Sequence, residues 1–343
     1  MIEKALPSAD DLTRLLGAGR VADVVVESAR DTILSHIVRL RLTYKGPSDG
    51  PTTLILKTGQ PARNRDLTWN GGRQEVAFYN QVAPSLPTGV VPRCHEAAWN
   101  ETTRDWHILL EDLTDTHAIP TAWPLPPSNE QCEVIIDAWA RFHAAWWDDS
   151  RLGMSIGNRP DQGAMDGYIR DLTARFGRFA DLLGDRLTPE RLRRYERLLT
   201  EGPRLLGRTH RPRHRTIVHR DAHVWNCFLP RDGGSDVRLF DWDGWRIGLA
   251  SSDLAYMMAT HWYPERRRRL ERPLLDRYHA TLLAQGVRGY GRAALDDDYR
   301  WSALWQITTP IWQATYDIPP GIWWNHLERT MAAFEDLGCA DLL

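Results

Sequence analysis

The most constraining feature of the sequence is a short, polar, strand-like island within a part of the chain that otherwise has helical character. Two β-type runs, Thr216–His219 and Val237–Phe240, are joined through loops rich in Asp, His and Asn. The first run begins the stretch TIVHRDAHVWNCFLP, and the second begins VRLFDWDGW. Functional side chains are often carried on loops that a rigid scaffold positions. The island therefore predicts a functional site in the C-terminal part of the chain.

Three residues of this island have the order that phosphoryl transfer requires. Asp221 and Asn226 stand five positions apart in one loop, and Asp241 follows the second strand. Phosphoryl transfer uses one carboxylate to orient the attacking hydroxyl and accept its proton, and oxygen ligands to hold Mg²⁺ on the phosphates. Asp221 fits the role of the base, and Asn226 and Asp241 fit the roles of metal ligands.

The first third of the sequence is β-rich and predicts a small α+β sheet domain. Alternating or β-branched segments indicate strands, and apolar residues at helical spacing indicate one helix. The expected strands are Val21–Glu27, Ile33–Tyr44, Thr52–Thr58, Cys94–Trp99 and Trp106–Glu111, with a helix over Gly71–Ala83 between the third and fourth.

The character of the chain changes after the Pro- and Thr-rich segment Asp112–Pro127. Ser128 and Gln131 form a plausible capping box for a helix over Asn129–Asp148. Most of the remaining chain has helical spacing, and the arginine run Arg266–Arg269 is typical of the solvated face of a helix. We therefore expect a β-rich N-lobe over residues 1–112 and a helical C-lobe over residues 113–343.

Composition and charge exclude several classes of protein. The net charge is −2, so no overall field favours nucleic acid or an anionic membrane as a partner. No stretch reaches the roughly 18 apolar residues of a membrane span, and the N-terminus lacks the apolar core of a signal peptide. The four cysteines form no C-x-x-C pair, which suits a reducing cytoplasm. We expect a cytoplasmic protein, monomeric or homodimeric.

The island also resembles a known superfamily. The pattern H-x-D-x-x-x-x-N at His219, Asp221 and Asn226, with the later Asp241, resembles the catalytic and metal-binding motifs of the protein-kinase-like superfamily. The D-W-D-G form, followed by S-S-D-L-A at Ser251–Ala255, is more similar to the aminoglycoside phosphotransferase and choline kinase branch.

Two N-terminal motifs narrow the resemblance. Q-E-V-A-F-Y at Gln74–Tyr79 and L-L-E-D-L at Leu109–Leu113 resemble the phosphotransferase group that includes ecdysteroid-kinase-like proteins. The resemblance implies a two-lobed protein-kinase-like fold, with one key helix in the N-lobe and a larger helical C-lobe. It also implies an ATP- and Mg²⁺-dependent kinase that phosphorylates a hydroxyl group of a small molecule.

The resemblance carries over to individual residues. Lys57 matches the strand lysine that contacts the α- and β-phosphates, and Glu75 matches the helix glutamate that pairs with it. A lysine beside a carboxylate stays charged and aimed. Glu111 and Leu113 match the hinge whose backbone groups bind adenine. Asp221 corresponds to the base, and the implied metal ligands are Asn226, Asp241 and, for a second ion, Asp243.

The sequence departs from the family pattern in three places. Arg220 stands where the family usually has Gly, and the expected phosphate loop Ser28–Thr32 contains no glycine. Backbone N–H groups of such a loop can still cradle phosphate. His223 adds an imidazole near the base, with no assigned role.

Other interpretations use the same residues. His219, Asp221 and His223 could form a metal-dependent hydrolase site, with further ligands from other histidines. Asp241-x-Asp243 resembles the nucleophile motif of haloacid-dehalogenase-like phosphatases, but it lies late in the chain. A nucleotide-binding scaffold without catalysis is a third possibility. A protein kinase would need a long activation segment, and DWDG leads within a few residues to Ser251–Ala255.

We expect the acceptor to be an antibiotic, a sugar, an amino alcohol or a related natural product. The chain has 16 tryptophans, which either fill the core or form an aromatic wall for a flat or cationic substrate. The candidates for such a wall are Trp301, Trp305, Trp312, Trp323 and Trp324. A polycationic acceptor would need an acidic cleft, to which Asp296–Asp298, Asp317 and Glu328 could contribute.

Overall fold

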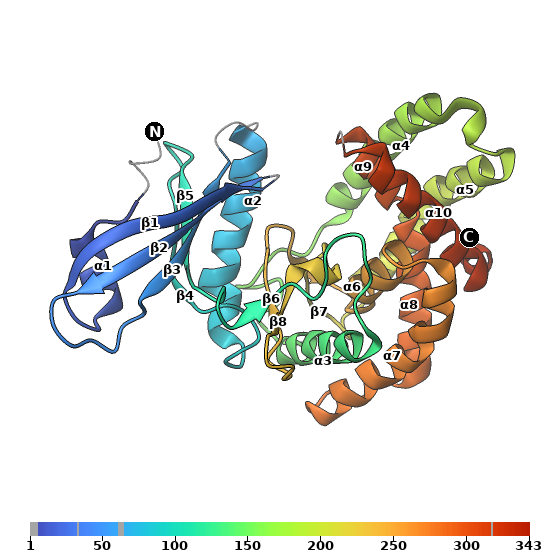
Figure 1. Ribbon diagram of the computed structural model, residues 1–343. Helices are drawn as coiled ribbons and strands as arrows, with labels where there is room; N and C mark the ends of the chain where they lie inside the picture. The colour runs from blue at the N-terminus through green and yellow to red at the C-terminus, as the bar shows by residue number, and fades with distance from the viewer. Residues whose placement is uncertain (1–5, 33, 61–64, 317) are drawn as a thin grey trace. The chain divides into compact units, whose positions relative to one another are not determined.

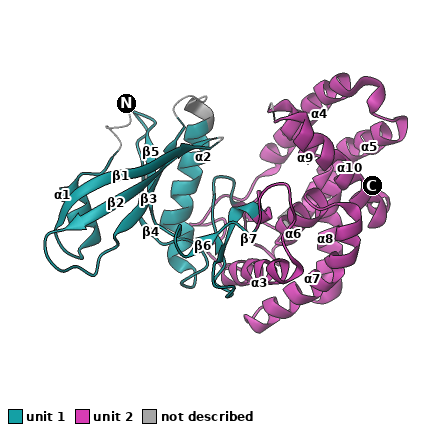
Figure 2. Cartoon of the chain, in the orientation of Figure 1, with its two compact units in different colours: residues 1–120, 225–245 teal, residues 121–224, 246–343 magenta. Residues whose placement is uncertain are grey.

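The computed structural model describes residues 6–32, 34–60, 65–316 and 318–343 (Figure 1). The chain forms two compact units (Figure 2), Met1–Pro120 with Trp225–Trp245, and Thr121–Val224 with Arg246–Leu343. The first unit contains the main β-sheet, and the second is mostly helical, which confirms the predicted α+β class. The division into lobes at residues 112 and 113 stays a prediction.

A five-stranded antiparallel sheet forms the centre of the first unit. Its strand order is β1-β2-β3-β5-β4. The predicted strands are confirmed, with β1 extending to Asp31; Ile33 lies outside the described residues. The bounds are β1 Val21–Asp31, β2 Ser35–Tyr44, β3 Thr53–Gly59, β4 Cys94–Trp99 and β5 Trp106–Glu111.

The apolar side chains of the sheet form one core cluster with a short N-terminal helix. Alternate residues of β2 and β3, among them Leu40 and Leu54, are fully buried together with Leu12. Leu12 belongs to α1 (Ala9–Leu16), which begins at a capping box between Ser8 and Asp11. This helix was not predicted from the sequence.

The helix that packs on β3, β4 and β5 is α2 (Arg65–Ala77), followed by a π-helical turn at Phe78–Val82 and a 3₁₀ turn at Ala83–Ser85. It begins six residues before the predicted start at Gly71. Gly71 and Gly72, the first residues of the predicted range, lie inside the helix. A Cβ on Gly72 would overlap the indole of Trp106, so close packing on β5 accounts for this glycine.

The segment 225–245 returns to the first unit. It contains β8 (Cys227–Pro230) and β9 (Arg238–Leu239), which form a three-stranded sheet with β6 (His117–Ala118) in the order β6-β8-β9. The amide of Leu239 donates to the carbonyl of Val90 at 2.9 Å. This segment therefore belongs to the same unit as the N-terminal sheet.

The second unit consists of helices around one short β-pair. In this pair, β7 (Thr216–Val218) runs antiparallel to β10 (Arg246–Gly248). The capping box of Ser128 and Gln131 is confirmed at the start of α3. The helices are α3 Asn129–Ala145, α4 Gln162–Leu183, α5 Pro189–Leu206, α6 Ser251–Ala255, α7 Pro264–Ala284, α8 Arg292–Gln306, α9 Thr309–Thr315 and α10 Pro320–Asp336. A π-helical turn at Tyr256–Thr260 comes directly after α6, and short 3₁₀ turns lie at Gly184–Arg186, Gly207–His210, Val224–Asn226 and Cys339–Leu342.

The arginine run on α7 is only partly solvated, which corrects the expectation of a solvated helix face. Arg267 is 1% exposed, and its guanidinium pairs with Glu271 at 2.8 Å and with Asp336. Tyr299 also donates to Glu271 at 2.8 Å, so one buried polar network connects α7, α8 and α10. No helix in the described ranges combines the length and the apolar character needed to cross a membrane.

Candidate active site

The β8–β9 hairpin brings Asn226 and Asp241 to the same end of two paired strands. Cys227 pairs with Leu239, and the amide of Phe240 donates to the carbonyl of Asn226 at 3.1 Å. Asn226 precedes the first strand and Asp241 comes two residues after the second. The backbone of Asp241 is left-handed, with φ of 70°, a conformation that Asp tolerates better than most residues. Two of the predicted metal ligands thus lie at one edge of this hairpin.

Lys57 connects the main sheet to this edge. Its Nζ lies 2.6 Å from Oδ1 of Asp241 and 2.6 Å from Oε2 of Glu75 on α2. Lys57 is 7% exposed and Glu75 is 1% exposed. The structure therefore brings together three of the predicted site residues, which stand far apart in the sequence.

The charges of this cluster depend on one another. Burial by itself lowers the pKa of Lys57, but the carboxylates of Asp241 and Glu75 outweigh it and raise the pKa above its ordinary value. Burial raises the pKa of Glu75, and the nearby Asp241 adds to this effect, whereas Lys57 opposes it. The lysine is therefore cationic at neutral pH and is held between two carboxylates.

The segment after Asp241 is fixed onto α2 and the turn at its C-terminal end. The rings of Phe78 and Trp242 stack with centroids 4.0 Å apart and an angle of 4° between their planes. Gln74 and Trp245 exchange two hydrogen bonds: the Gln74 amide donates to the Trp245 carbonyl at 2.7 Å, and the Trp245 indole donates to the Gln74 carbonyl at 2.8 Å. Both tryptophans are buried, as the core-packing interpretation expected.

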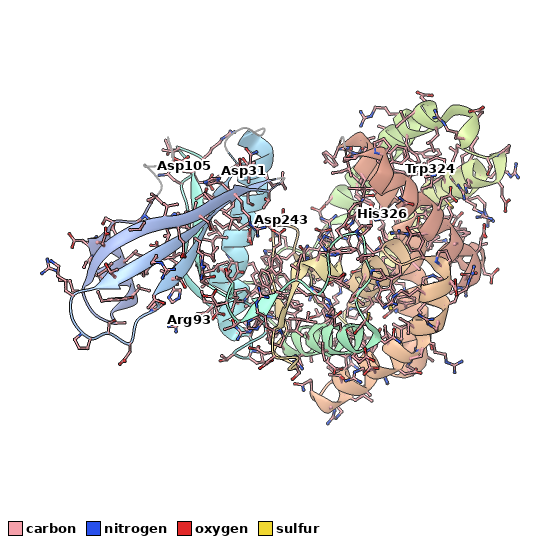
Figure 3. The ribbon with its side chains drawn as sticks, in the orientation of Figure 1. Asp31, Arg93, Asp105, Asp243, Trp324 and His326 are labelled. Carbon is pink, nitrogen blue, oxygen red and sulfur yellow. The ribbon has the colours of Figure 1, made fainter. Side chains whose placement is uncertain are left out.

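The remaining predicted site residues of the first unit are Glu111, Leu113 and Asp243. Asp243 is labelled in Figure 3, and a Cβ on Gly71 of α2 would lie 3.4 Å from its Oδ2. The side chain of Glu111 at the end of β5 accepts hydrogen bonds from the Arg93 amide at 2.8 Å and from Arg238 at 2.7 Å. The carbonyl of Leu113 accepts the amide of His117 at 2.8 Å. Their expected role in adenine binding stays a prediction.

The loop that carries Asp221 belongs to the second unit and depends on Asp253. The carboxylate of Asp253 accepts the amides of His219 at 2.7 Å and Arg220 at 2.9 Å. Asp253 is 1% exposed, and its Oδ2 also lies 3.2 Å from Nε2 of His143. Asp253 belongs to the S-S-D-L-A motif, for which the sequence alone indicated no role.

Two polar side chains lie beside the carboxylate of Asp221. The hydroxyl of Tyr256 donates to Oδ1 at 2.7 Å, and Nε2 of His223 lies 3.4 Å from Oδ2. The side chain of Asp221 is 43% exposed, so it remains accessible to a substrate. Tyr256 was not predicted as a site residue, because only the fold brings it to Asp221.

A row of imidazoles continues from His223. The rings of His223 and His261 lie 5.3 Å apart, and those of His261 and His326 lie 4.6 Å apart. Nδ1 of His326, a residue labelled in Figure 3, lies 2.8 Å from Oε1 of Gln313. Because an amide oxygen only accepts, this contact places a proton on Nδ1 of His326.

The hydrolase interpretation finds no support in this geometry. His219 is fully buried, its Nδ1 accepts the amide of Asp221 at 3.2 Å, and its ring packs edge-on against Trp139. Within the described part of the chain, no three His, Cys, Asp or Glu side chains are arranged to hold a metal ion. This finding does not bear on a magnesium site completed by nucleotide phosphates, because Asn226 and water or phosphate oxygens can supply the other ligands.

The tryptophans expected to form an aromatic wall divide into two groups. Trp301 and Trp323 are 6% exposed and belong to the core, whereas Trp305, Trp312 and Trp324 are half-buried. The guanidinium of Arg175 lies 4.4 Å from the ring centre of Trp312 and 4.5 Å from that of Tyr316. The exposed aromatic surface of α9 therefore already contacts a cation.

Three of the acidic residues that could contribute to an acidic cleft for a polycationic acceptor are paired with arginines. Asp298 is buried and accepts hydrogen bonds from Arg208 and Arg211, and Asp296 pairs with Arg292. Glu328 pairs with Arg191 at 2.7 Å. Asp317 lies outside the described residues. Each of these paired carboxylates is neutralised by an arginine.

Comparisons with known proteins agree with the geometry. The profile of the ecdysteroid kinase-like family matches residues 29–286, well over half of the chain. A comparison with curated proteins found no match.

Among solved structures, a GDP complex of an aminoglycoside 2′-phosphotransferase-IIIa variant is similar, with 10% identity over 96% of each chain and a TM-score of 0.56. Ethanolamine kinase from Plasmodium vivax is also similar, with 12% identity over 91% of this chain and 81% of that one, and a TM-score of 0.53. These likenesses confirm the predicted protein-kinase-like fold. The chain therefore belongs to the ecdysteroid kinase-like family and is a phosphotransferase with an alcohol group as acceptor.

Proposed function

We propose that the protein transfers the γ-phosphoryl group of ATP, together with Mg²⁺, to a hydroxyl of a small natural product, with Asp221 as the base. The observation that carries this proposal is the buried cluster of Lys57, Glu75 and Asp241, in which one ammonium lies 2.6 Å from each carboxylate. A cation held in this way is suited to contact phosphate oxygens, because its charge is retained and its position is fixed by two partners.

Lys57 is the proposed contact to the α- and β-phosphates, and Glu75 aims it. Glu75 comes from α2, which the Gln74–Trp245 hydrogen bonds and the Phe78–Trp242 stack fix to the segment that carries Asp241. Lys57 and the proposed metal-binding carboxylate of Asp241 are therefore held next to each other before a nucleotide binds. The backbone of Glu111 and Leu113 is proposed to bind the adenine.

Asn226 and Asp241 are the proposed Mg²⁺ ligands, with Asp243 as a ligand of a second ion. Their oxygen donors fit Mg²⁺, which usually binds one or two carboxylates and completes its shell with water and substrate phosphates. When bound, Mg²⁺ supplies positive charge to the phosphate oxygens. The ion pair of Lys57 with Asp241 supports the same site, since it shows that Asp241 attracts a cation at this edge.

The nucleotide is proposed to be ATP on the basis of the motif resemblance. The GDP in the aminoglycoside 2′-phosphotransferase-IIIa complex supports a purine nucleotide on this fold. Both ATP and GTP therefore belong in any activity measurement.

For the acceptor, we propose a hydroxylated natural product of low positive charge, such as a neutral antibiotic or a sugar. Three of the acidic residues that could attract a polycation, Asp296, Asp298 and Glu328, are paired with arginines. Arg175 contacts the rings of Trp312 and Tyr316, so Trp312, one candidate for an aromatic wall, already faces a cation. Both observations favour an uncharged ring system over an amino alcohol or an aminoglycoside.

A nucleotide-consumption screen tests this proposal. Purified protein with Mg²⁺ and either ATP or GTP is assayed against neutral macrolides, sugars, polycyclic alcohols, amino alcohols and aminoglycosides, and the product is identified by its added phosphate mass. Asp221→Asn is the matched variant, because it keeps the size of the side chain and removes the base.

We expect turnover with an uncharged acceptor, and a loss of about 10²- to 10⁴-fold in Asp221→Asn, the range typical of general-base catalysis. Wild-type turnover in Asp221→Asn would contradict its role as the base. Nucleotide binding without consumption across the whole panel would support the scaffold interpretation instead.

A further inference from the structure

Tyr256 contacts the carboxylate of Asp221 through a short hydrogen bond. Its hydroxyl lies 2.7 Å from Oδ1, while Oδ2 lies on the side of His223, 3.4 Å from Nε2. A hydroxyl that donates to a carboxylate stabilises its ionised form and restricts its rotation. The two oxygens of Asp221 therefore have different neighbours, Tyr256 at Oδ1 and His223 at Oδ2.

The position of Tyr256 is fixed by an irregular backbone turn. Tyr256 begins the π-helical turn Tyr256–Thr260 directly after α6, and such turns occur frequently at functional sites. Its carbonyl oxygen accepts a hydrogen bond from Nδ1 of His261 at 2.9 Å, and the two rings lie 4.8 Å apart. Because a carbonyl only accepts, Nδ1 of His261 carries the proton. The imidazole of His261 thus contacts Tyr256 at two places, the phenol ring and the backbone carbonyl.

The supporting imidazoles add no charge beside the base at neutral pH. Burial lowers the pKa of His261 well below its usual value, and the neighbouring His326 and His223 lower it further, against smaller opposing effects of the Tyr256 carbonyl and Asp221. Burial, Arg329 and His223 lower the pKa of His326 to about 4. At pH 7, His261 and His326 therefore act as neutral packing and hydrogen-bonding groups.

We propose that Tyr256 is a positioning residue for the catalytic base: it holds Oδ1 of Asp221 and so presents Oδ2 to the acceptor alcohol. The inference rests on the proposed function of Asp221. In this step the acceptor O–H bond breaks and its proton passes to Oδ2, while the acceptor oxygen bonds to the γ-phosphorus. The bond between this phosphorus and the bridging oxygen breaks, and that oxygen leaves with the electron pair as part of the nucleoside diphosphate.

The test compares Tyr256→Phe with Tyr263→Phe. Both changes remove one phenolic hydroxyl from the same unit, but Tyr263 is 55% exposed and its ring packs on Arg329. In Tyr256→Phe, kcat should fall at least about tenfold, as expected when a hydrogen bond to a charged group is lost. The nucleotide KM should stay unchanged, and the acid limb of the pH–rate profile should move to higher pH, because the ionised carboxylate has lost a donor. Tyr263→Phe should leave all three unchanged.

A second pair of variants keeps the inference falsifiable if Tyr256→Phe does not fold. His261→Asn retains a side-chain donor for the Tyr256 carbonyl, whereas His261→Leu removes it. We expect the leucine variant to reproduce the lower kcat and the shifted acid limb, and the asparagine variant to recover part of both. Equal behaviour of these two variants would overturn the inference.

The outcomes also separate this inference from the proposed function. An unchanged pH–rate profile in a folded Tyr256→Phe protein, with Asp221→Asn inactive, would overturn the role of Tyr256 alone. Full activity in Asp221→Asn would overturn the proposed base and the inference together.

Discussion

At the scale of single residues, Lys57 shows how a charge can be kept in the interior of a protein. An ammonium that is 7% exposed is unfavourable unless opposite charges compensate for its lost hydration. Glu75 and Asp241 supply this compensation from α2 and from the segment after β9. Glu75 in turn depends on Lys57 to compensate the charge of its carboxylate, because the glutamate is even more deeply buried than the lysine.

This dependence predicts the effect of Lys57→Met on stability. Removing one partner of a buried pair typically costs about 3–5 kcal/mol, so we expect the free energy of unfolding to fall by about 3 kcal/mol near pH 8. The loss should be smaller at about pH 5. Burial raises the pKa of Glu75, and a carboxyl with a raised pKa contributes stability at low pH that is lost as the pH rises. Urea denaturation at both pH values measures this difference.

The double variant Lys57→Met with Glu75→Gln is the control for this interpretation. A neutral amide at position 75 removes the unpaired carboxylate, so stability near about pH 8 should be partly restored. If Lys57→Met were as stable as the wild type at both pH values, the proposed coupling of the two charges would be wrong.

His326 leads to a second pH-dependent prediction. Its pKa falls from 6.5 to about 4 in the folded protein, so the unfolded chain binds a proton that the folded chain does not between these values. Stability should therefore decrease as the pH falls from about 6.5 towards 4. His326→Asn, which can keep the donor to Gln313, should show a weaker decrease in melting temperature over this range.

His279→Asn is the matched replacement outside the imidazole row. His279 contacts the carbonyl of Tyr290 at 2.8 Å, and its loss should leave the pH dependence due to His326 in place. An identical pH dependence in the wild type and in His326→Asn would contradict the assignment.

Several individual residues could be predicted from the sequence, and others could not. Asp221, Asn226 and Asp241 carry a motif with fixed spacing along the chain, so the sequence alone is enough to propose their roles. Tyr256 lies 35 residues from Asp221, and its hydroxyl meets the carboxylate only because a π-helical turn comes after α6. Contacts of this kind leave no periodic signal in a sequence.

At the scale of elements, α2 is the helix on which the proposed nucleotide site depends. It carries Glu75 and Gln74, and its Gly72 faces the indole of Trp106 without room for a side chain. Glycine inside a helix is normally unfavourable by about 1 kcal/mol relative to alanine. The glycine is therefore explained by close packing between α2 and β5.

Gly72→Ala should consequently lower the free energy of unfolding, although helix propensity alone predicts that alanine stabilises a helix. The new methyl group would overlap Trp106 and displace α2, so both the melting temperature and the turnover should fall. Gly177→Ala on α4 is the matched control, because no atom apart from its chain neighbours and the nearby backbone of its own helix lies within 4 Å of its Cβ position. In this control, the free energy of unfolding should increase by up to about 1 kcal/mol. A stabilised Gly72→Ala protein would contradict the packing argument.

Elements that depend on neighbouring residues in the chain could be predicted, whereas features that depend on contacts with distant segments could not. The strands of the main sheet and the start of α3 were predicted, because alternating apolar residues and a capping box act between neighbours in the chain. The start of α2 was not, because Gly72 inside the helix is explained by its close approach to Trp106 on another segment. The π-helical turns after α2 and α6 were missed for a similar reason.

At the scale of the whole molecule, the order of strands and helices predicted the α+β class, and the motif resemblance predicted the protein-kinase-like fold. The return of residues 225–245 to the unit of the N-terminal sheet could not be predicted, because it depends on strand pairing with β6 and on contacts with α2. This return is what places Asp241 beside Lys57. The proposed nucleotide site is therefore a property of the fold of the first unit.

The magnesium dependence of ATP binding tests the proposed site most directly. Isothermal titration calorimetry, with and without Mg²⁺, is applied to the wild type, to Asp241→Asn and to Asp236→Asn, a control on the same hairpin whose carboxylate pairs with Arg238. If Asp241 is the metal ligand, Mg²⁺ should strengthen ATP binding at least about tenfold in the wild type and in the control, and this gain should disappear in Asp241→Asn. An Asp241→Asn protein that keeps the full gain from Mg²⁺ would contradict the proposed nucleotide site.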